Sequence, residues 1–351
     1  MESPQPVLKW AGGKRQLLAV IDQELPKELK EGKIKQYFEP MLGGGAVFFH
    51  IKEKYGGMIE SYHISDFNWD LFVLYRVIQS HVKELIKELE SLASEYLPLP
   101  PTQQGEKEGE RISMFERIRK EYNSKKWIDI RYRTDGKTPR KRFSKEWVRR
   151  SALTIFLNRT CFNGLYRVNS KGEFNVPHGR YDNPDIVNSR NLLLVNQALK
   201  RVRINVGSYE QFLDEMGPDS FVYFDPPYRP LPDTNSFKEY HKAKFGDAEQ
   251  LKLADQCKEL DAKGVKFMLS NSDPKNTDSG DDFFDDAYSD FTLLRVDANR
   301  NINSDGAKRG KISEILVRNY EVRGCLQKKL FPLKIEKDGE FLSKTQYGEV
   351  P

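Results

Sequence analysis

Short runs of apolar residues alternate along this chain with longer stretches whose apolar positions recur at helical spacing. The run at residues 221–224, Phe-Val-Tyr-Phe, is typical of a parallel strand that is buried on both faces. Because segments of strand and helix character follow one another in turn, the pattern predicts a doubly wound α/β fold. The predicted strands are 58–65, 202–206, 221–224, 265–269, 291–296 and 312–319, and the predicted helices are 69–96, 112–122, 144–158, 184–200 and 247–262.

One part of the chain departs from this alternation. A Pro- and Gln-rich loop at residues 97–105 predicts the start of an inserted subdomain. Basic residues then far outnumber acidic ones between residues 116 and 150, and aromatic residues are interleaved with them. This combination is the electrostatic footprint expected for a nucleic-acid partner, although a solvated helical face with a basic loop explains the charge equally well.

Composition narrows the class of protein. The 351 residues suffice for one large domain or two smaller ones, and 38% hydrophobic with 31% charged residues describes a soluble globular protein. No apolar run approaches the length of a membrane span, and the first residues lack the pattern of a signal peptide. Three widely spaced cysteines fit a reducing cytoplasm and give no disulfide or metal-binding pattern. The net charge of +5 is by itself weak support for a polyanionic partner.

Two prolines end the run at 221–224 abruptly, in the sequence Asp225-Pro226-Pro227-Tyr228. Ligands of open α/β sheets bind just beyond the carboxyl ends of the strands, so this tetrapeptide is expected at such an edge. Hydrogen bonds accepted by Asp225 and by the Pro226 carbonyl would draw the lone pair of an adenine amine out of conjugation, and Tyr228 would stack on the base. A plain strand-ending turn is the alternative for the tetrapeptide alone.

A glycine-rich turn follows an earlier short strand, in Phe38-Glu39-Pro40-Met41-Leu42-Gly43-Gly44-Gly45. Such a turn before an apolar helix lets a ligand lie against the backbone and the helix N-terminus. Its spacing matches neither a dinucleotide fingerprint nor a phosphate-binding loop. An acid at Glu39 would repel a pyrophosphate but suits an ammonium group, which favours the methionine end of S-adenosylmethionine.

Two further segments hold candidate cofactor contacts. Asp66 follows the second predicted strand, where an acid commonly binds ribose hydroxyls; capping of the next helix is also credible, and both roles can hold together. Near the N-terminus, Gly12-Gly13 enters an amphipathic segment, and Trp10 and Lys14 beside it suit a charged, partly aromatic ligand. A Gly-Gly pair at the start of a helix is common, so this segment alone is weak evidence for a ligand site.

The segment 158–181 is rich in asparagine and glycine, with Lys171-Gly172 at a predicted hairpin turn. Planar polar side chains, an arginine and a few apolar tips are the groups that read base edges in the major groove. A turn-rich surface hairpin without a partner is the alternative, and the basic stretch upstream of it weakens that alternative.

Four motifs, taken in this order, resemble those of the Dam-like and DpnM-like DNA adenine-N6 methyltransferases. They are Lys-Trp-Ala-Gly-Gly-Lys at 9–14, Phe-Glu-Pro-x-x-Gly-Gly-Gly at 38–45, Phe-Asn-Gly-Leu-Tyr-Arg-Val-Asn at 162–169 and Asp-Pro-Pro-Tyr at 225–228. The segments 174–181 and 309–315 are also similar to that family. Each motif is modest alone, but the ordered set is highly specific and covers roughly residues 7–320. The long 97–109 loop, the basic 137–142 loop and the C-terminal tail depart from the family.

The resemblance implies a Rossmann-like, S-adenosylmethionine-binding catalytic domain at 1–96 and 184–320. It also implies an inserted target-recognition domain at 97–183, mainly helical with a β-hairpin, and leaves a tail at 321–351 without a role. The implied reaction is direct methyl transfer to N6 of a flipped adenine in double-stranded DNA, in GATC or another GAT-containing site, without a metal.

The resemblance also implies roles for particular residues. Asp225, Pro226, Pro227 and Tyr228 would be catalytic, and the cofactor contacts would be Trp10, Lys14, Glu39, Gly43, Gly45, Asp66 and Asp225. The DNA contacts would be Asn163, Leu165, Arg167, Asn169, Pro177, Tyr181, Arg140 and Lys141. Among them, Arg167 would read a guanine beside the target, and the basic loop with Arg140 would touch phosphate.

Three rival interpretations stay open at this point. An RNA or free-base amine methyltransferase is disfavoured by the hairpin motif, and a DNA-binding protein without catalysis is disfavoured by the intact Asp-Pro-Pro-Tyr. A cytosine-N4 enzyme would more often carry serine at position 225. The sequence fits three biological roles: protection of DNA against a cognate restriction endonuclease, a role in repair or regulation, and a role in a phage. In each case the expected location is the cytoplasm of a bacterial or phage-infected cell.

Overall fold

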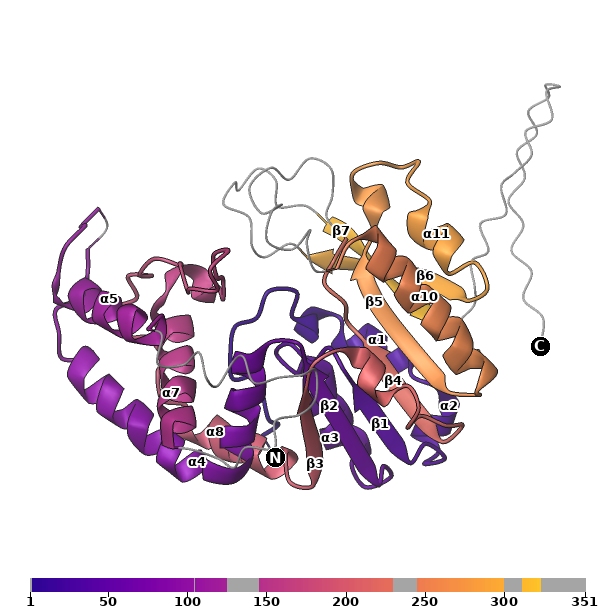
Figure 1. Cartoon of the computed structure of the whole chain (residues 1–351), viewed down its shortest axis with the longest axis horizontal. Coiled ribbons are helices and arrows are strands. Elements are labelled where there is room, and N and C mark those ends of the chain that lie inside the picture. Colours follow the sequence, from indigo (N-terminus) through magenta and orange to yellow (C-terminus); the bar gives the residue numbers. More distant parts are fainter. Residues whose placement is uncertain (1, 104, 125–144, 230–244, 300–310, 323–351) are drawn as a thin grey trace, which may run out of the picture.

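The computed structural model describes residues 2–103, 105–124, 145–229, 245–299 and 311–322. Strands of these residues form one sheet of seven, in the order β3-β2-β1-β4-β5-β7-β6 (Figure 1). The five neighbouring strands from β3 to β5 in this order pair in parallel, and β7 pairs antiparallel with both β5 and β6. The bounds are β1 (Gln36–Glu39), β2 (Ser61–Asp66), β3 (Val202–Val206), β4 (Ser220–Phe224), β5 (Lys266–Ser272), β6 (Thr292–Asn299) and β7 (Lys311–Arg318). The predicted doubly wound α/β class is confirmed.

Side chains of successive residues in a strand point to opposite faces of the sheet, and β4 uses both faces for burial. Phe221 and Tyr223 join the hydrophobic cluster on one face, whereas Val222 and Phe224 join the cluster on the other. All residues of β4 are buried, as the continuous apolar run predicts.

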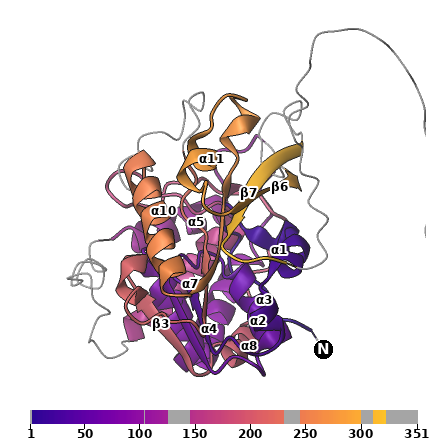
Figure 2. The same ribbon diagram turned by 90° about the vertical axis from the view of Figure 1, so that its right-hand side faces the viewer.

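Helices cover the two faces of the sheet (Figure 2). On one face lie α1 (Leu18–Glu24), α2 (Lys27–Lys30), α3 (Ala46–Tyr55) and α8 (Ser189–Ala198), and on the other lie α10 (Asp247–Ala262) and α11 (Phe283–Ala287). Short 3-10 turns occur at η1 (Lys14–Gln16), η3 (Phe162–Gly164), η4 (Tyr209–Phe212) and η5 (Pro274–Asn276). Among the described residues, no helix has the length and apolar character needed to cross a membrane.

A helical part extends beyond the β3 edge of the sheet (Figure 1). It consists of α4 (Trp69–Tyr96), whose backbone departs from helical angles at His81, with α5 (Glu110–Tyr122) and α7 (Lys145–Thr160). A short hairpin follows α7, with Val168 bridged to Phe174 and Gly172 at φ +76° in its turn. The predicted hairpin turn is therefore confirmed. One cluster of buried side chains runs from the sheet into these helices, and the proposed division at residues 97 and 183 stays a prediction.

A buried ion pair joins the helices of this part. Arg150 of α7 donates to both carboxylate oxygens of Asp70 on α4, at 2.7 and 2.9 Å. The hydroxyls of Tyr122 on α5 and Tyr166 on the hairpin donate to the same carboxylate, at 2.9 and 2.8 Å. A buried ion pair needs such additional hydrogen bonds to offset the loss of solvation of its charges. The network thus ties three helices and the hairpin into one unit.

A second buried ion pair joins the beginning of the described chain to its end. Arg318 in β7 donates to Glu24 in α1 across 3.1 Å, and the Tyr320 hydroxyl donates to the Glu24 carbonyl at 3.0 Å. The side chains of both members of the pair are at most 8% exposed. The last strand therefore packs against the first helix.

Candidate active site

The strand order reverses between β1 and β4, because the chain continues from β1 to β2 and β3 on one side and from β4 to β5 on the other. In doubly wound sheets, ligands bind outside the carboxyl ends of the strands at such a point. β1 ends at Glu39 and leads into the glycine-rich turn, and β4 ends at Phe224 and leads directly to Asp225. The two motifs that the sequence analysis singled out therefore leave neighbouring strands at one edge.

Asp225 receives hydrogen bonds from two other segments. The Lys14 ammonium lies 2.7 Å from Asp225 Oδ1 and also donates to the Gly12 carbonyl at 2.8 Å. The Ser270 hydroxyl, at the end of β5, donates to Asp225 Oδ1 at 3.2 Å. Burial raises the pKa of Asp225, and the Lys14 charge opposes that rise. Lys14, which is only 3% exposed, therefore favours the ionised carboxylate that accepts hydrogen bonds.

Tyr228 lies between a cation and a second carboxylate. Lys14 Nζ is 4.8 Å from the centroid of the Tyr228 ring, which is within the range of a cation–π contact. The Tyr228 hydroxyl donates to Glu314 Oε2 at 2.5 Å. The structure therefore gathers Asp225, Lys14 and Tyr228 into one group, and it adds Glu314 from β7.

The glycine-rich turn is shaped by two residues with positive φ. Gly43 has φ +51° and Gly45 has φ +75°, a region that side chains other than glycine rarely adopt. A Cβ on Gly43 would stand 3.0 Å from the indole of Trp10, so the ring lies directly against this turn. The same turn is bound to the next strand, because the Gly43 amide donates to Asp66 Oδ2 at 2.8 Å.

Asp66 holds two backbone amides at the end of β2. Besides the Gly43 amide, its carboxylate accepts from the Asn68 amide at 2.7 Å. Burial raises the pKa of Asp66 to about 6, with a further contribution from the negative charge of Asp225 and opposition from the two amides. The cap of the following helix α4 is the side chain of Asn68, which accepts from the Asp70 amide, so capping by Asp66 itself is not its observed role.

Glu39 is almost fully buried, with 2% of its surface exposed. The Tyr37 hydroxyl donates to its carboxylate. Burial raises the pKa of Glu39 well above its usual range, and the nearby Asp225 charge adds to the rise. Glu39 thus lies close enough to Asp225 for the two carboxyl groups to influence each other.

The predicted DNA-contacting residues that the structure describes lie on the hairpin that follows α7 and on the segment beyond it. Asn163, Arg167 and Pro177 are exposed. Arg167 Nε donates to Asn175 Oδ1 at 2.7 Å, so the guanidinium is braced across the hairpin. Two further candidates are Leu165, which is partly buried, and Asn169, whose amide donates to Glu173 at 2.9 Å. Arg140 and Lys141 lie outside the described residues.

The structure also shows residues that the sequence analysis missed. Lys9 Nζ lies 5.2 Å from the ring centroid of Tyr181, at the base of the hairpin. Two large aromatic side chains are exposed beside predicted site residues, Phe67 at 70% next to Asp66 and Phe162 at 50% in η3. An aromatic residue beside a predicted ligand-binding position is the signal that was available for both. Lys9 begins the motif at 9–14, but no local pattern indicates its contact with Tyr181, because that partner is distant in sequence.

Asn158 of α7 is a further missed residue, and it joins the N-terminal motif to the hairpin. Its side chain accepts from the Lys9 amide at 2.9 Å and donates to the carbonyls of Lys9 at 3.0 Å and Gly164 at 2.7 Å. Gly164 has φ +65°, and a Cβ there would stand 2.3 Å from the Lys9 side chain. One fully buried amide therefore fixes the backbone next to Trp10 and the start of the hairpin together.

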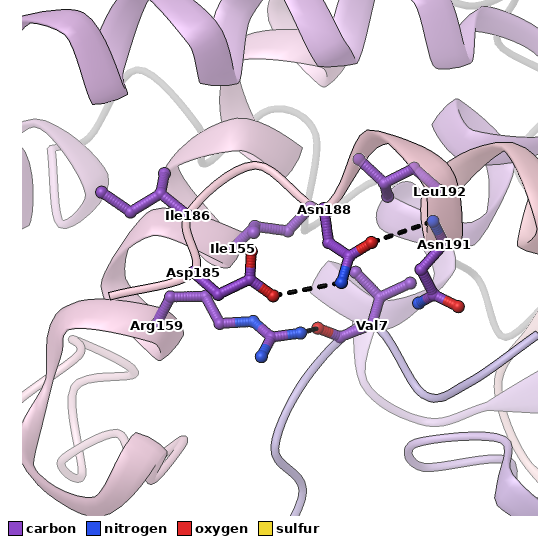
Figure 3. A pocket seen from close by; sticks show the side chains of 8 residues that line it. All are labelled: Val7, Ile155, Arg159, Asp185, Ile186, Asn188, Asn191 and Leu192. Atoms are coloured by element: carbon purple, nitrogen blue, oxygen red, sulfur yellow. Dashed lines mark hydrogen bonds between the residues drawn. The ribbon is translucent and has the colours of Figure 1, made fainter. Parts of the chain in front are cut away.

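A small pocket lies apart from this edge, between the N-terminal segment, α7 and α8 (Figure 3). Arg159 donates to the Val7 carbonyl at 2.6 Å, and Asn188 donates to Asp185 at 3.1 Å. The residues that line it include none of the predicted site residues. The polar groups of this pocket fix the N-terminal segment against the helices.

The fold and this edge are typical of α/β proteins that bind ligands at the switch point of a doubly wound sheet. The family model of the D12 class N6 adenine-specific DNA methyltransferases matches residues 10–302. The chain therefore belongs to that family and is an adenine-specific DNA methyltransferase, as the motifs predicted.

Individual relatives agree with this assignment. The chain is 44% identical over 317 residues to the Type II methyltransferase M.MjaIII of Methanocaldococcus jannaschii, covering 90% of this chain and 99% of that protein. It is 35% identical over 320 residues to the Type II methyltransferase M1.LlaDCHI of Lactococcus lactis subsp. cremoris, covering 90% and 95%. It is 30% identical over 316 residues to the DNA adenine methylase of Salmonella typhi, again covering 90% and 95%.

Proposed function

We propose that this enzyme methylates N6 of adenine in double-stranded DNA, in GATC or another GAT-containing site, with S-adenosylmethionine as the methyl donor. The observation that carries the proposal is the juxtaposition of Asp225 and Tyr228 with the glycine-rich turn at the switch point of the sheet. The choice of GATC rests on the resemblance of the hairpin motif.

The residues around the turn suit S-adenosylmethionine. Glycine at positions 43 and 45 permits the positive φ of the turn, and the absence of a Cβ on Gly43 lets the Trp10 ring pack directly against the backbone. The carboxylate of Asp66 suits ribose hydroxyls, and the exposed ring of Phe67 beside it suits an adenine face. Trp10 and Glu39 complete the proposed contacts, the first as a wall and the second as a carboxyl whose ionised form the ammonium end would favour. When bound, the cofactor supplies an electrophilic methyl group on a sulfonium centre.

Asp225 prepares the target amine. The adenine amine donates hydrogen bonds to the Asp225 carboxylate and to the Pro226 carbonyl, which draws its lone pair out of the ring and toward the methyl group. An ionised carboxylate has room for several hydrogen bonds, so Lys14 can stay bound to Asp225 and keep it ionised. The new N–C bond forms as the sulfonium C–S bond breaks, and N6 then releases a proton to solvent. The chain forms no covalent bond to the substrate.

The amine cannot be reached inside a base stack, so the target adenine is turned out of the duplex and stacks on Tyr228. The hairpin reads the surrounding sequence. Arg167, exposed and braced by Asn175, presents its guanidinium to a guanine, and Lys9 with Tyr181 offers a second contact at the base of the hairpin. Leu165 and Pro177 help to define the site, Asn163 and Asn169 complete the hairpin contacts, and Arg140 and Lys141 contact phosphate.

The direct test is to express the protein in a host that lacks DNA methylation and to sequence the DNA for N6-methyladenine. We expect methylated adenine in GATC. Methylation of another GAT-containing site would support the proposed reaction but contradict the GATC specificity. Unmethylated DNA from a host that contains the folded protein would contradict the proposed reaction.

Two relatives are named Type II methyltransferases, which supports a role beside a cognate restriction endonuclease in the cytoplasm. In that role, DNA from the expressing host should resist an endonuclease that cuts the same site when it is unmethylated. Cleavage of fully methylated DNA by the endonuclease of the same system would contradict the protective role.

A further inference from the structure

The residues on both sides of Tyr228 are bound by side chains of α10. Gln250 donates to the Pro227 carbonyl at 2.9 Å. Arg229 binds Asp247 through two hydrogen bonds of 2.8 and 3.1 Å. Because proline also fixes φ at the two preceding positions, little backbone freedom remains at Tyr228. The freedom that remains is the rotation of the Tyr228 side chain.

Glu314 restricts that rotation from the other side of the site. It accepts the Tyr228 hydroxyl at 2.5 Å. Glu314 is paired with Ser272 at the end of β5, because β7 runs antiparallel to β5. The beginning of β7 therefore lies at the edge where the parallel strands end, and it brings a carboxylate to the catalytic loop.

We propose that Glu314 is a positioning residue for methyl transfer, which holds the Tyr228 hydroxyl and so fixes the ring plane on which the flipped adenine stacks. The inference rests on the proposed function, because it requires that Tyr228 stacks on the target base. Glu314 does not touch the reacting atoms and acts through Tyr228.

Two observations make the contact suitable for this role. Burial raises the pKa of the Tyr228 phenol, and the charges of Asp225 and Glu314 raise it further, so the hydroxyl remains a donor at neutral pH. Lys14 approaches the ring from another direction, 4.8 Å from its centroid. Without the acceptor, the side chain would have other staggered rotamers open to it, and only part of the population would present the ring correctly.

The test compares single-turnover methylation rates of Glu314→Ala, Tyr228→Phe and the double variant, on a GATC duplex at saturating S-adenosylmethionine. Each single change removes the same hydrogen bond to a charged group and should slow the reaction about tenfold. The double variant should be no slower than either single variant. Glu314→Gln keeps an acceptor and should restore most of the rate. The Kd for S-adenosylmethionine should stay unchanged throughout.

A matched control is Ser313→Ala, the adjacent position in β7, because Ser313 donates to Asp273 rather than to Tyr228. It should leave the methylation rate near that of the wild type. Thermal unfolding of each variant checks the fold, and Glu314→Leu makes the same comparison if Glu314→Ala does not fold.

Two results would overturn the role of Glu314: a wild-type rate in Glu314→Ala, or independent, multiplied losses in the double variant. A different variant tests the proposed function on which this role rests. A wild-type rate in Tyr228→Ala would contradict the stacking role of Tyr228, whatever the effect of Glu314→Ala.

Discussion

Trp10 stacks on Tyr166, with ring centroids 5.0 Å apart and an interplanar angle of 28°. Trp10 belongs to the N-terminal motif beside the glycine-rich turn, and Tyr166 belongs to the hairpin that we propose reads DNA. The same two segments are joined by Asn158. The proposed cofactor and DNA sites therefore share a rigid boundary rather than a flexible linker.

This stack predicts that a hairpin substitution changes cofactor affinity. Tyr166→Ala removes an aromatic pair, which contributes about 0.5–1.5 kcal/mol, so the Kd for S-adenosylmethionine should rise roughly two- to tenfold. Tyr166→Phe keeps the stack and should leave the Kd near that of the wild type, although it loses the hydrogen bond to the charged Asp70 and should lower the free energy of unfolding by about 1.5–3 kcal/mol. Calorimetric titration and urea denaturation measure the two effects. Equal Kd changes in both variants would contradict the role of the stack.

Asp225→Ala should remove methylation while it weakens cofactor binding only in part. A positioned polar group that acts on the reacting amine contributes about 100-fold or more to the rate. Single-turnover kinetics on a GATC duplex measure the loss, and a near-normal rate would refute the assignment. The wild-type rate should persist in excess chelator, since the proposed transfer uses no metal.

Cofactor affinity should depend on pH through Asp66. The pKa of this carboxyl is raised to about 6, so above that pH it is ionised and can accept hydrogen bonds from the ribose hydroxyls of the proposed cofactor. As the pH falls below 6, protonation removes the acceptor, and the affinity should fall by at most about tenfold per pH unit. Titrations with S-adenosylmethionine from pH 5 to pH 8 measure this slope. Because the pKa values of Asp225 and Glu39 are also raised, Asp66→Asn is the matched control. It should bind more weakly at pH 8 and lose the slope, and an unchanged slope in it would assign the effect to another carboxyl.

Substitutions of Arg167 and of the basic loop should have different effects on DNA binding and specificity. Arg167→Ala should flatten the preference between GATC and duplexes changed at one outer base pair, because a bidentate arginine–guanine contact contributes about 1–3 kcal/mol of discrimination. Arg140→Ala combined with Lys141→Ala should weaken binding to every sequence alike and reduce its dependence on salt. Methylation rates and binding at several salt concentrations separate the two. If Arg167 only braces the hairpin through Asn175, its removal lowers stability and activity on all sites equally.

The sequence predicted elements best where burial is uniform or periodic. The helices α4 and α10 and the strand β3 have the predicted bounds, because long amphipathic stretches and apolar runs determine them. Helix α8 was predicted to begin at residue 184 but begins at Ser189. The Asn188 side chain caps it there by accepting from the Asn191 amide, and the apolar positions on either side of that cap do not show where the helix starts.

Only the parts of the candidate site that lie within local sequence motifs were predicted. Asp225 and the glycine-rich turn were found because each follows a strand, and strand ends meet at one edge. The contact between Tyr228 and Glu314 was not predictable in this way, since it spans 86 residues and depends on β7 running antiparallel to β5. Asn158 was missed for a similar reason. Its side-chain amide binds backbone groups. Because every residue carries these groups, the pattern of residue types does not indicate such a contact.

The ion pair between Glu24 and Arg318 bears on how the protein is made. Its members are 294 residues apart, so α1 cannot reach its final packing until β7 has left the ribosome. The helical part has its own contacts between α4 and α7 and can form earlier during synthesis. The nascent chain should thus carry an ordered helical part before its sheet is closed, and methylation competence should arise only after translation has passed β7.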